Sequence, residues 1–328
     1  MADVDGSFDV AVIPVPNRRL AVVVKSPERA ALGHPPLDGF ALLLVLIGLM
    51  VIALIVAAVV DSARRHAREA EASVETMRLR AATDAAVVTA VRDLAEAGAV
   101  APPFLSHPVD VHLGDIQVSL SVRPESSKID LNVADPALMK ALLLTLNFKP
   151  ESAARLSDEI ADWRDSDAEP RPHGAEASDY LGAGRSYGPT NRDIESVSEL
   201  ALLLDGSEDL VACLAPHVTV FSHRADVEPT TASEPVRRAL NMIKPRAVPD
   251  AAPSSASVVA GHVIIAGEIF EIDTDAKGAA GPGFSRRTIA RMTGDPRRPD
   301  WILSQTSPVP RPAEVRAACD RAARAPPR

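Results

Sequence analysis

The segment from Phe40 to Val60 constrains the fold of this chain most strongly, because it contains no charged residue. About 20 apolar residues suffice to cross a bilayer as a helix, since each residue adds 1.5 Å across a hydrocarbon core of about 30 Å. Soluble helices rarely stay apolar on every face over that length. We therefore predict a single-pass membrane anchor at residues 40–60 and a globular body in the residues that follow.

The residues that flank this segment leave two kinds of anchor open. The segment is too long for the apolar region of an ordinary signal peptide, which has about 7–15 residues. The junction Gly39–Phe40 fits a plain signal anchor, and it also fits a prepilin, in which a hydrophilic leader is removed after a Gly. Residues 1–39 would then be the leader. The arginines at 64–68 favour a cytoplasmic body by the positive-inside rule, which conflicts with the export that later features imply.

Composition narrows the classes of partner. The formal net charge is −9, so nucleic acid is not an expected partner. The chain has two cysteines, Cys213 and Cys319, whose wide separation does not suggest a zinc site. They pair in an oxidising compartment or remain free thiols, and the sequence leaves both open. Residues 308–328 are rich in Pro and Arg, and we expect a disordered tail there.

A long helix is expected to continue beyond the membrane segment. Between residues 64 and 97 the chain is rich in Ala, Glu, Arg and Leu, which are strong helix formers. Apolar residues recur there at spacings of three and four, which predicts one apolar face that packs on the globular body. The residues of this predicted stripe are Val74, Met77, Ala81, Ala85, Val88, Val91 and Leu94 or Ala95.

Strand patterns occur on both sides of a helical region. Residues 109–113 and 116–122 alternate apolar and polar side chains around Gly114-Asp115, which is a hairpin signature. We assign residues 61–127 to the long helix and the first strands, and residues 258–307 to closing strands. Two strands alone are marginally stable, so the hairpin is expected to join the later strands in one sheet under the helix.

The region between these strands reads as a separate helical domain. Residues 128–244 contain short helices with polar loops, and the Pro/Ala/Ser-rich residues 245–257 read as a linker. The predicted fold class is therefore α+β: a long N-terminal helix packed on an antiparallel sheet, with an inserted all-α domain and a single-pass membrane anchor.

An acidic loop carries the densest potential chemistry. Asp165, Asp167, Glu169 and Glu176 occupy positions 1, 3, 5 and 12 of an EF-hand-like count, and their oxygen ligands favour Ca²⁺. Position 6 is Pro170, so this is not an EF-hand loop. The alternative is a solvated acidic loop whose charge is offset by nearby arginines.

Four motifs resemble one known family, the K-type minor pseudopilins of type II secretion. The motifs are ADWRDSDAEPRPHGAEASDY, YGPTNRDIESVSEL, KIDLNVADPALMKALL and MTGDPRRPDWILSQ. This resemblance extends over about residues 40–305. It implies a pilin-like fold, a place at the tip of a periplasmic pseudopilus, and structural calcium in the inserted domain. It also implies an inner-membrane anchor with the body in the periplasm, cleavage of the leader by prepilin peptidase between Gly39 and Phe40, and methylation of the new N-terminus.

The same resemblance assigns assembly roles to residues of the helix. Ordinary pilin-like subunits carry a Glu at the fifth position of the mature helix, where a carboxylate in hydrocarbon is costly unless it is paired. The fifth residue from Phe40 is Leu44, which fits a first, capping subunit that has no predecessor to pair with. Contacts with other minor pseudopilins are expected through Val74, Met77, Ala81, Val88 and Leu94.

Two other functions were weighed against this structural role. A membrane-anchored, metal-dependent periplasmic enzyme would use the acidic loop, but we find no Ser/His/Asp, His-Glu-x-x-His or Gly-rich phosphate motif. A DNA-binding module is disfavoured by the acidic charge. We therefore expect a protein that initiates pseudopilus assembly for export of folded proteins, with no enzymatic activity, no small-molecule substrate and no nucleic-acid partner.

Overall fold

The computed structural model describes residues 38–97, 102–105, 107–243, 266–278, 283–295 and 297–325. Most of the predicted leader, the predicted linker at 245–257 and the strand-like residues 258–265 lie outside the described residues. The chain divides into two units, residues 1–68 and residues 69–328.

The described part of the first unit is entirely helical and belongs to α1 (Asp38–Glu96). Among the described helices, α1 is the one with the length and apolar character to cross a membrane, and its apolar window has a mean hydropathy of 3.4. The side chains of this window are exposed in the chain by itself. This is compatible with the predicted single-pass anchor at residues 40–60.

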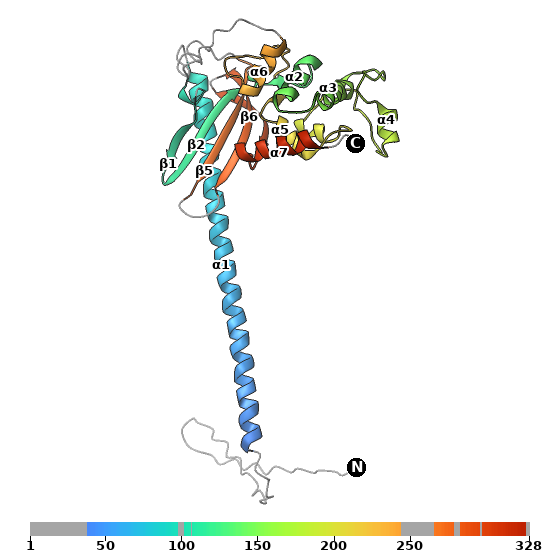
Figure 1. The fold of residues 1–328 in the computed structure, drawn as a ribbon. Helices are drawn as coiled ribbons and strands as arrows, with labels where there is room; N and C mark the ends of the chain where they lie inside the picture. The colour runs from blue at the N-terminus through green and yellow to red at the C-terminus, as the bar shows by residue number, and fades with distance from the viewer. Residues whose placement is uncertain are drawn as a thin grey trace, which may run out of the picture. The chain divides into compact units, whose positions relative to one another are not determined.

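The second unit is built on a five-stranded antiparallel sheet of order β1-β2-β5-β6-β7 (Figure 1). Its strands are β1 (Val109–Leu113), β2 (Ile116–Pro124), β5 (Ile269–Lys277), β6 (Phe284–Asp295) and β7 (Arg298–Thr306). A short 3₁₀ helix, η1 (Pro103–Leu105), precedes β1. The predicted hairpin forms at Gly114, whose φ of 64° suits a residue without a side chain. The early hairpin joins the late strands, so the predicted fold class is confirmed.

The C-terminal part of α1 packs on one face of this sheet. Its buried apolar residues contact β2, β5 and β6 in two adjoining clusters. They recur every three or four positions, as expected for one helix face: Leu79, Ala82, Ala86, Val87, Ala90, Val91 and Leu94.

The predicted contact stripe on α1 is therefore mostly wrong. Val74, Met77 and Val88 are 57%, 65% and 68% exposed, and only the C-terminal members of the predicted set are buried. The helix carries two apolar faces, and spacing alone does not choose between them. The face that packs is rich in alanine, whose small side chain lets the helix backbone come close to the strands.

The helical domain occupies the sequence between β2 and β5. Its helices are α2 (Pro136–Thr145), α3 (Pro150–Arg164), α4 (Ala177–Gly182), α5 (Glu208–Leu214) and α6 (Glu234–Ile243), with short 3₁₀ helices η2 (Glu125–Ser127) and η3 (Val197–Ala201). Two short parallel strands, β3 (Ile129–Asp130) and β4 (Val218–Thr219), pair the beginning of this domain with its later part. Asp135 caps α2 through its side chain, as its place before Pro136 predicts.

The described part of residues 308–328 contains a helix, α7 (Pro312–Arg324), where the sequence predicts a disordered tail. That prediction is wrong, because Ala318 and Cys319 are buried against the helical domain and Cys319 forms a disulfide with Cys213 of α5. The tail is rich in Pro and Arg, which led to the prediction of disorder, but its alanines form most of an apolar helix face.

Buried charges connect the sheet to the helical domain. We call this group the junction cluster; it consists of Arg123, Glu125, Lys128, Glu271, Asp273 and Arg287. The ammonium of Lys128 lies 2.8 Å from Glu125 and 2.6 Å from Glu271, and all three side chains are nearly inaccessible. Arg123 and Arg287 contact Glu271 at 2.6 and 2.9 Å. The three acids are thus matched by three bases, as buried charges require.

Candidate metal site in the helical domain

The acidic loop connects the end of α3 to the start of α4. Asp165 is the C-cap residue of α3, and Glu176 is the N-cap residue of α4. The backbone N–H of Glu176 donates to Asp179 Oδ2 at 2.8 Å, which fixes the turn into α4. Two of the predicted ligands are therefore held by helix ends, which position a side chain more firmly than a free loop does.

The structure brings together three of the four predicted ligands. Carboxylate oxygens of Asp165, Asp167 and Glu176 all lie within 4.8 Å of one another. We call these three residues the acidic site. Glu169 is not part of it, so its assignment from the sequence is wrong. Its side chain is exposed, and its backbone N–H donates to Asp167 Oδ1 at 2.9 Å.

Two buried oxygens of the acidic site lack a hydrogen-bond partner within the described part of the chain. They are Oδ1 of Asp165 and Oε1 of Glu176. Buried carboxylate oxygens without donors are rare and costly, and an unplaced ion is one of the explanations that such atoms call for. The other oxygen of Asp165 is occupied by the guanidinium of Arg171. Asp165 thus has one oxygen neutralised by the protein and one left free.

The electrostatics of the acidic site show a shortage of positive charge. Burial raises the pKa of Glu176, and repulsion from Asp162, Asp165 and Asp167 raises it further. Arg171 is the cation held between these acids: hydrogen bonds to Asp165 and Asp162 raise its own pKa. The nearby arginines do not offset the repulsion at Glu176, and a bound cation would relieve it.

Arg171 and Asp162 support the site, and sequence reasoning did not assign them this role. Asp162 is completely buried, and it accepts from the side chain of Arg171 at 2.6 Å and from its backbone N–H at 3.1 Å. Gly174 is required beside it, because a Cβ there would lie 1.8 Å from Asp162 Oδ2. Asp162 lies one helical turn before Asp165, and that spacing was the signal that could have identified it.

An aromatic group anchors the loop to the domain core. Trp163 and Tyr180 are buried with ring centroids 5.9 Å apart, and Tyr187 continues the series at 5.9 Å from Tyr180. The indole N–H of Trp163 donates to Glu199 at 3.1 Å. The side-chain amide of Asn191 binds the loop by donating to the carbonyl of Asp167 at 3.0 Å. The site therefore rests on a packed scaffold.

The remaining predicted residues are distributed along α1. Gly39 and Phe40 both lie within the helix, which begins at Asp38, and Leu44 is exposed. Of the residues expected to meet partner subunits, Leu94 is only 1% exposed and belongs to the chain's own core. It is therefore unavailable to a partner, and that prediction is wrong.

The other assembly residues keep exposed side chains: Val74, Met77, Ala81 and Val88. Leu94 differs from them because it lies on the face of α1 that the sheet covers.

A helix on an antiparallel sheet with an inserted helical domain defines a pilin-like architecture, and the solved structures contain a match to it. The chain aligns with a chain of the crystal structure of the GspK-GspI-GspJ complex from the type 2 secretion system of enterotoxigenic Escherichia coli. The TM-score is 0.54 at 16% identity, over 73% of this chain and 98% of that one. At this identity the likeness concerns the fold.

Sequence comparisons point to the same family through the helical domain. Residues 120–223 match the family model described as type II secretion system (T2SS), protein K. Type II secretion system protein K of Pseudomonas aeruginosa is 38% identical over 107 residues, which is 32% of each chain. The protein of that name from Dickeya chrysanthemi is 31% identical over 84 residues, or 26% of this chain and 23% of the relative.

The resemblance inferred from the motifs is confirmed over residues 120–223, which match the protein K model of the type II secretion system. The matched region spans about a third or less of the curated relatives' length.

Proposed function

We propose that this protein is a minor pseudopilin that caps the tip of a periplasmic pseudopilus and initiates its assembly together with other minor pseudopilins. The observation that carries the proposal is the helical domain inserted between β2 and β5, since it holds the protein K match. The chain matched in the solved structures belongs to a GspK-GspI-GspJ complex, which supports partners of that kind. The role is structural: the protein binds and orients other subunits and catalyses no reaction.

The proposed topology places the helical and strand regions in the periplasm, anchored in the inner membrane by α1. Prepilin peptidase would remove the leader at Gly39–Phe40, and the new N-terminus would be methylated. N-terminal sequencing and mass determination of membrane-extracted protein test this directly. A start at Phe40 supports the proposal, whereas a retained leader in cells with working secretion contradicts it.

The exposed face of α1 is the proposed contact with neighbouring subunits. Val74, Met77, Ala81 and Val88 remain exposed after the sheet has covered the opposite face. Apolar residues at this spacing on an exposed face suit packing against a partner helix. Leu44 adds a second feature, because an apolar residue at this depth needs no charged partner from a preceding subunit.

Two adjacent residues provide a matched test of this contact. Val88 is 68% exposed, whereas Val87 is 5% exposed and packs in the sheet core. Val88→Asp should leave thermal stability nearly unchanged but reduce secretion in a strain that lacks the native gene. Val87→Asp should lower stability and protein level, because it buries a charge. Full secretion with Val88→Asp at normal protein level would contradict the proposed contact.

We propose that the acidic site binds a calcium ion through Asp165, Asp167 and Glu176. The set fits Ca²⁺ because all three side chains offer hard oxygen ligands, and two of their buried oxygens are without donors. His173 does not join them: its Nδ1 lies 3.2 Å from Oδ2 of Asp158, a residue of α3 outside the acidic site. The proposed ion is structural and would hold the end of α3 to the start of α4.

Calcium removal tests this proposal. The wild-type chain should melt at a lower temperature in chelator than in excess calcium, because a ligand at 100 times its Kd stabilises by about 2.7 kcal/mol. The double variant Asp167→Ala/Glu176→Ala should lose this difference. Glu169→Ala is the matched control, since it removes a nearby carboxylate that lies outside the site, and it should keep the difference. An equal melting temperature of the wild type with and without chelator would rule out the ion.

A further inference from the structure

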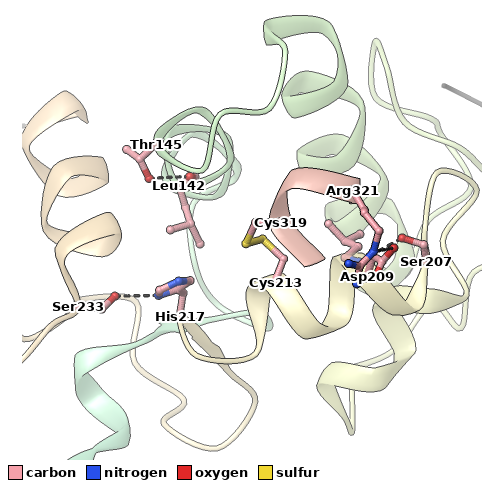
Figure 2. Close-up of a disulfide and its surroundings, with 10 residues drawn as sticks. Leu142, Thr145, Ser207, Asp209, Cys213, His217, Ser233, Cys319 and Arg321 are labelled. Carbon is pink, nitrogen blue, oxygen red and sulfur yellow. Dashed lines mark hydrogen bonds and ion pairs between the residues drawn. A yellow bond between two sulfur atoms is a disulfide. The ribbon is translucent and has the colours of Figure 1, made fainter. Parts of the chain in front are cut away.

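The C-terminal helix α7 is joined to the helical domain by a disulfide between residues that lie 106 positions apart. Figure 2 shows Cys319 of α7 facing Cys213 of α5. Cys213 is completely buried and Cys319 is 8% exposed. Ala318 is buried beside them, and Val315 packs partly on the same core. The bond therefore lies inside the interface that α7 forms.

Without the disulfide, few interactions hold α7 in place. Arg321 forms two hydrogen bonds with Asp209 of α5, at 2.7 and 3.0 Å, which raise the pKa of Arg321 and lower that of Asp209. Arg321 is 60% exposed and Asp209 is 37% exposed, and ion pairs that are open to solvent contribute little to stability. The buried side chains of α7 are mostly alanine and cysteine, which bury little apolar area.

The other end of α7 is anchored to the sheet. The connection from β7 contains Pro308 and Pro310, which limit its conformations. Ser307 Oγ donates to the carbonyl of Ser285 at 2.7 Å, and the N–H of Val309 donates to Ser285 Oγ at 2.9 Å. Ser285 lies at the start of β6. The connection is thus attached to the sheet, and α7 is attached to the helical domain.

We infer that α7 is a brace between the sheet and the helical domain, and that oxidation of Cys213 and Cys319 locks it. The two cysteines are 106 positions apart, so both the helical domain and α7 must reach an oxidising compartment before the bond can form. The brace closes only after the sheet and the helical domain have formed the two surfaces that it connects. This inference does not depend on the proposed role at the pseudopilus tip.

The chemistry requires a disulfide donor as partner, either a thiol-oxidising protein or a small disulfide. One thiolate of the pair attacks a donor sulfur, forms a mixed disulfide and releases one donor thiolate. The second thiolate attacks the protein sulfur of that mixed disulfide, closes the Cys213–Cys319 bond and releases the second donor thiolate. The donor gains two electrons, and the two protons lost by the cysteines end on its thiols.

Hydrogen exchange on the full-length chain in detergent tests the brace. Reduction of the wild type should speed the exchange of α7 amides by at least about tenfold, because opening of α7 no longer requires the bond to break. Amides of β1 and β2 should not change. The melting temperature should fall by roughly 10 °C, as expected for opening a loop of about 100 residues in a chain of this size. Equal protection of α7 in the reduced and oxidised chain would overturn the inference.

Re-oxidation with glutathione disulfide as the probe donor provides the second arm. In the reduced wild type it should consume both thiols, restore protection of α7 and recover the melting temperature. Cys213→Ser/Cys319→Ser is the matched control: it should behave like the reduced wild type and should not respond to the probe. A product that carries two separate glutathione adducts would show that the two thiols are not placed to pair, which also overturns the inference.

Discussion

Two groups of buried acids in this protein have opposite charge balance. In the junction cluster every buried acid faces a lysine or arginine of the chain itself, as with Lys128 between Glu125 and Glu271. In the acidic site Arg171 forms an ion pair with Asp165, but two buried carboxylate oxygens have no donor within the described residues. The comparison teaches that burial of acids does not by itself indicate a ligand site. A deficit of positive charge does, because the protein would otherwise bear uncompensated repulsion.

The pKa values show the same contrast. Burial alone would raise the pKa of Glu271, but Lys128, Arg287 and Arg123 outweigh it and lower the value to about 2. The pKa of Glu176 is raised, because burial is reinforced by neighbouring acids. Acidification should therefore weaken the junction cluster and relieve the calcium-free acidic site.

The largest effect is expected from removing a base of the junction cluster. Lys128→Met leaves Glu125 and Glu271 buried without their shared cation, and breaking a buried pair in this way costs about 3–5 kcal/mol of unfolding free energy. Lys140→Met is the control, because Lys140 is exposed on α2 and its replacement should change stability by no more than about 0.5 kcal/mol. Urea unfolding measures both. Equal costs for the two variants would mean that the junction cluster does not stabilise the fold.

The next effect is a loss of stability in acid that originates at His217, next to the junction cluster. Burial lowers the pKa of His217 to about 4, and Arg123 and Lys128 contribute to this shift. Its ring lies 2.8 Å from Ser233 Oγ (Figure 2). Because the unfolded chain binds a proton at about pH 6.5, stability should fall as the pH drops from 6.5 to 4, by about 3 kcal/mol in total.

His217→Asn isolates this contribution, since Asn keeps a polar atom near Ser233 but does not titrate in this range. Unfolding free energy measured against pH should lose its slope between pH 6.5 and 4 in the variant. The loss due to Glu271 should remain, because its stabilising charge is present above pH 4.5 and is lost only as the pH falls towards 2. A slope that is unchanged in His217→Asn would assign the acid sensitivity to other groups.

The smallest effect is expected from Glu176→Gln in the acidic site, whose effect on stability should change sign when calcium is added. In chelator, Glu176→Gln should raise stability by about 1 kcal/mol, because it removes a carboxylate that other acids repel. In excess calcium the same substitution should lower stability by up to about 2.7 kcal/mol relative to the wild type, because it weakens the proposed ion site. Glu169→Gln should show neither effect. A Glu176→Gln variant with the same sign under both conditions would contradict the calcium proposal.

Local patterns in the sequence predicted much of the fold. The apolar run at 40–60 and the hairpin around Gly114 each depend on neighbours within a few residues, and the structure contains both. The acidic loop was also recognisable from spacing. Its outcome was mixed, because Glu169 turns to solvent while the more distant Glu176 returns to the site at the start of α4.

The sequence by itself determined most of the helices and strands other than α7, and that a helical domain interrupts the sheet, because caps, turns and periodicity act over short distances. Only the tertiary structure decided which face of α1 is buried, that Lys128 meets Glu271 across 143 positions, and that α7 closes onto Cys213. Such choices depend on which surfaces meet after the chain has folded. The net charge of the buried groups where those surfaces meet distinguishes a structural cluster, in which acids and bases are balanced, from a candidate ion site, in which negative charge is in excess.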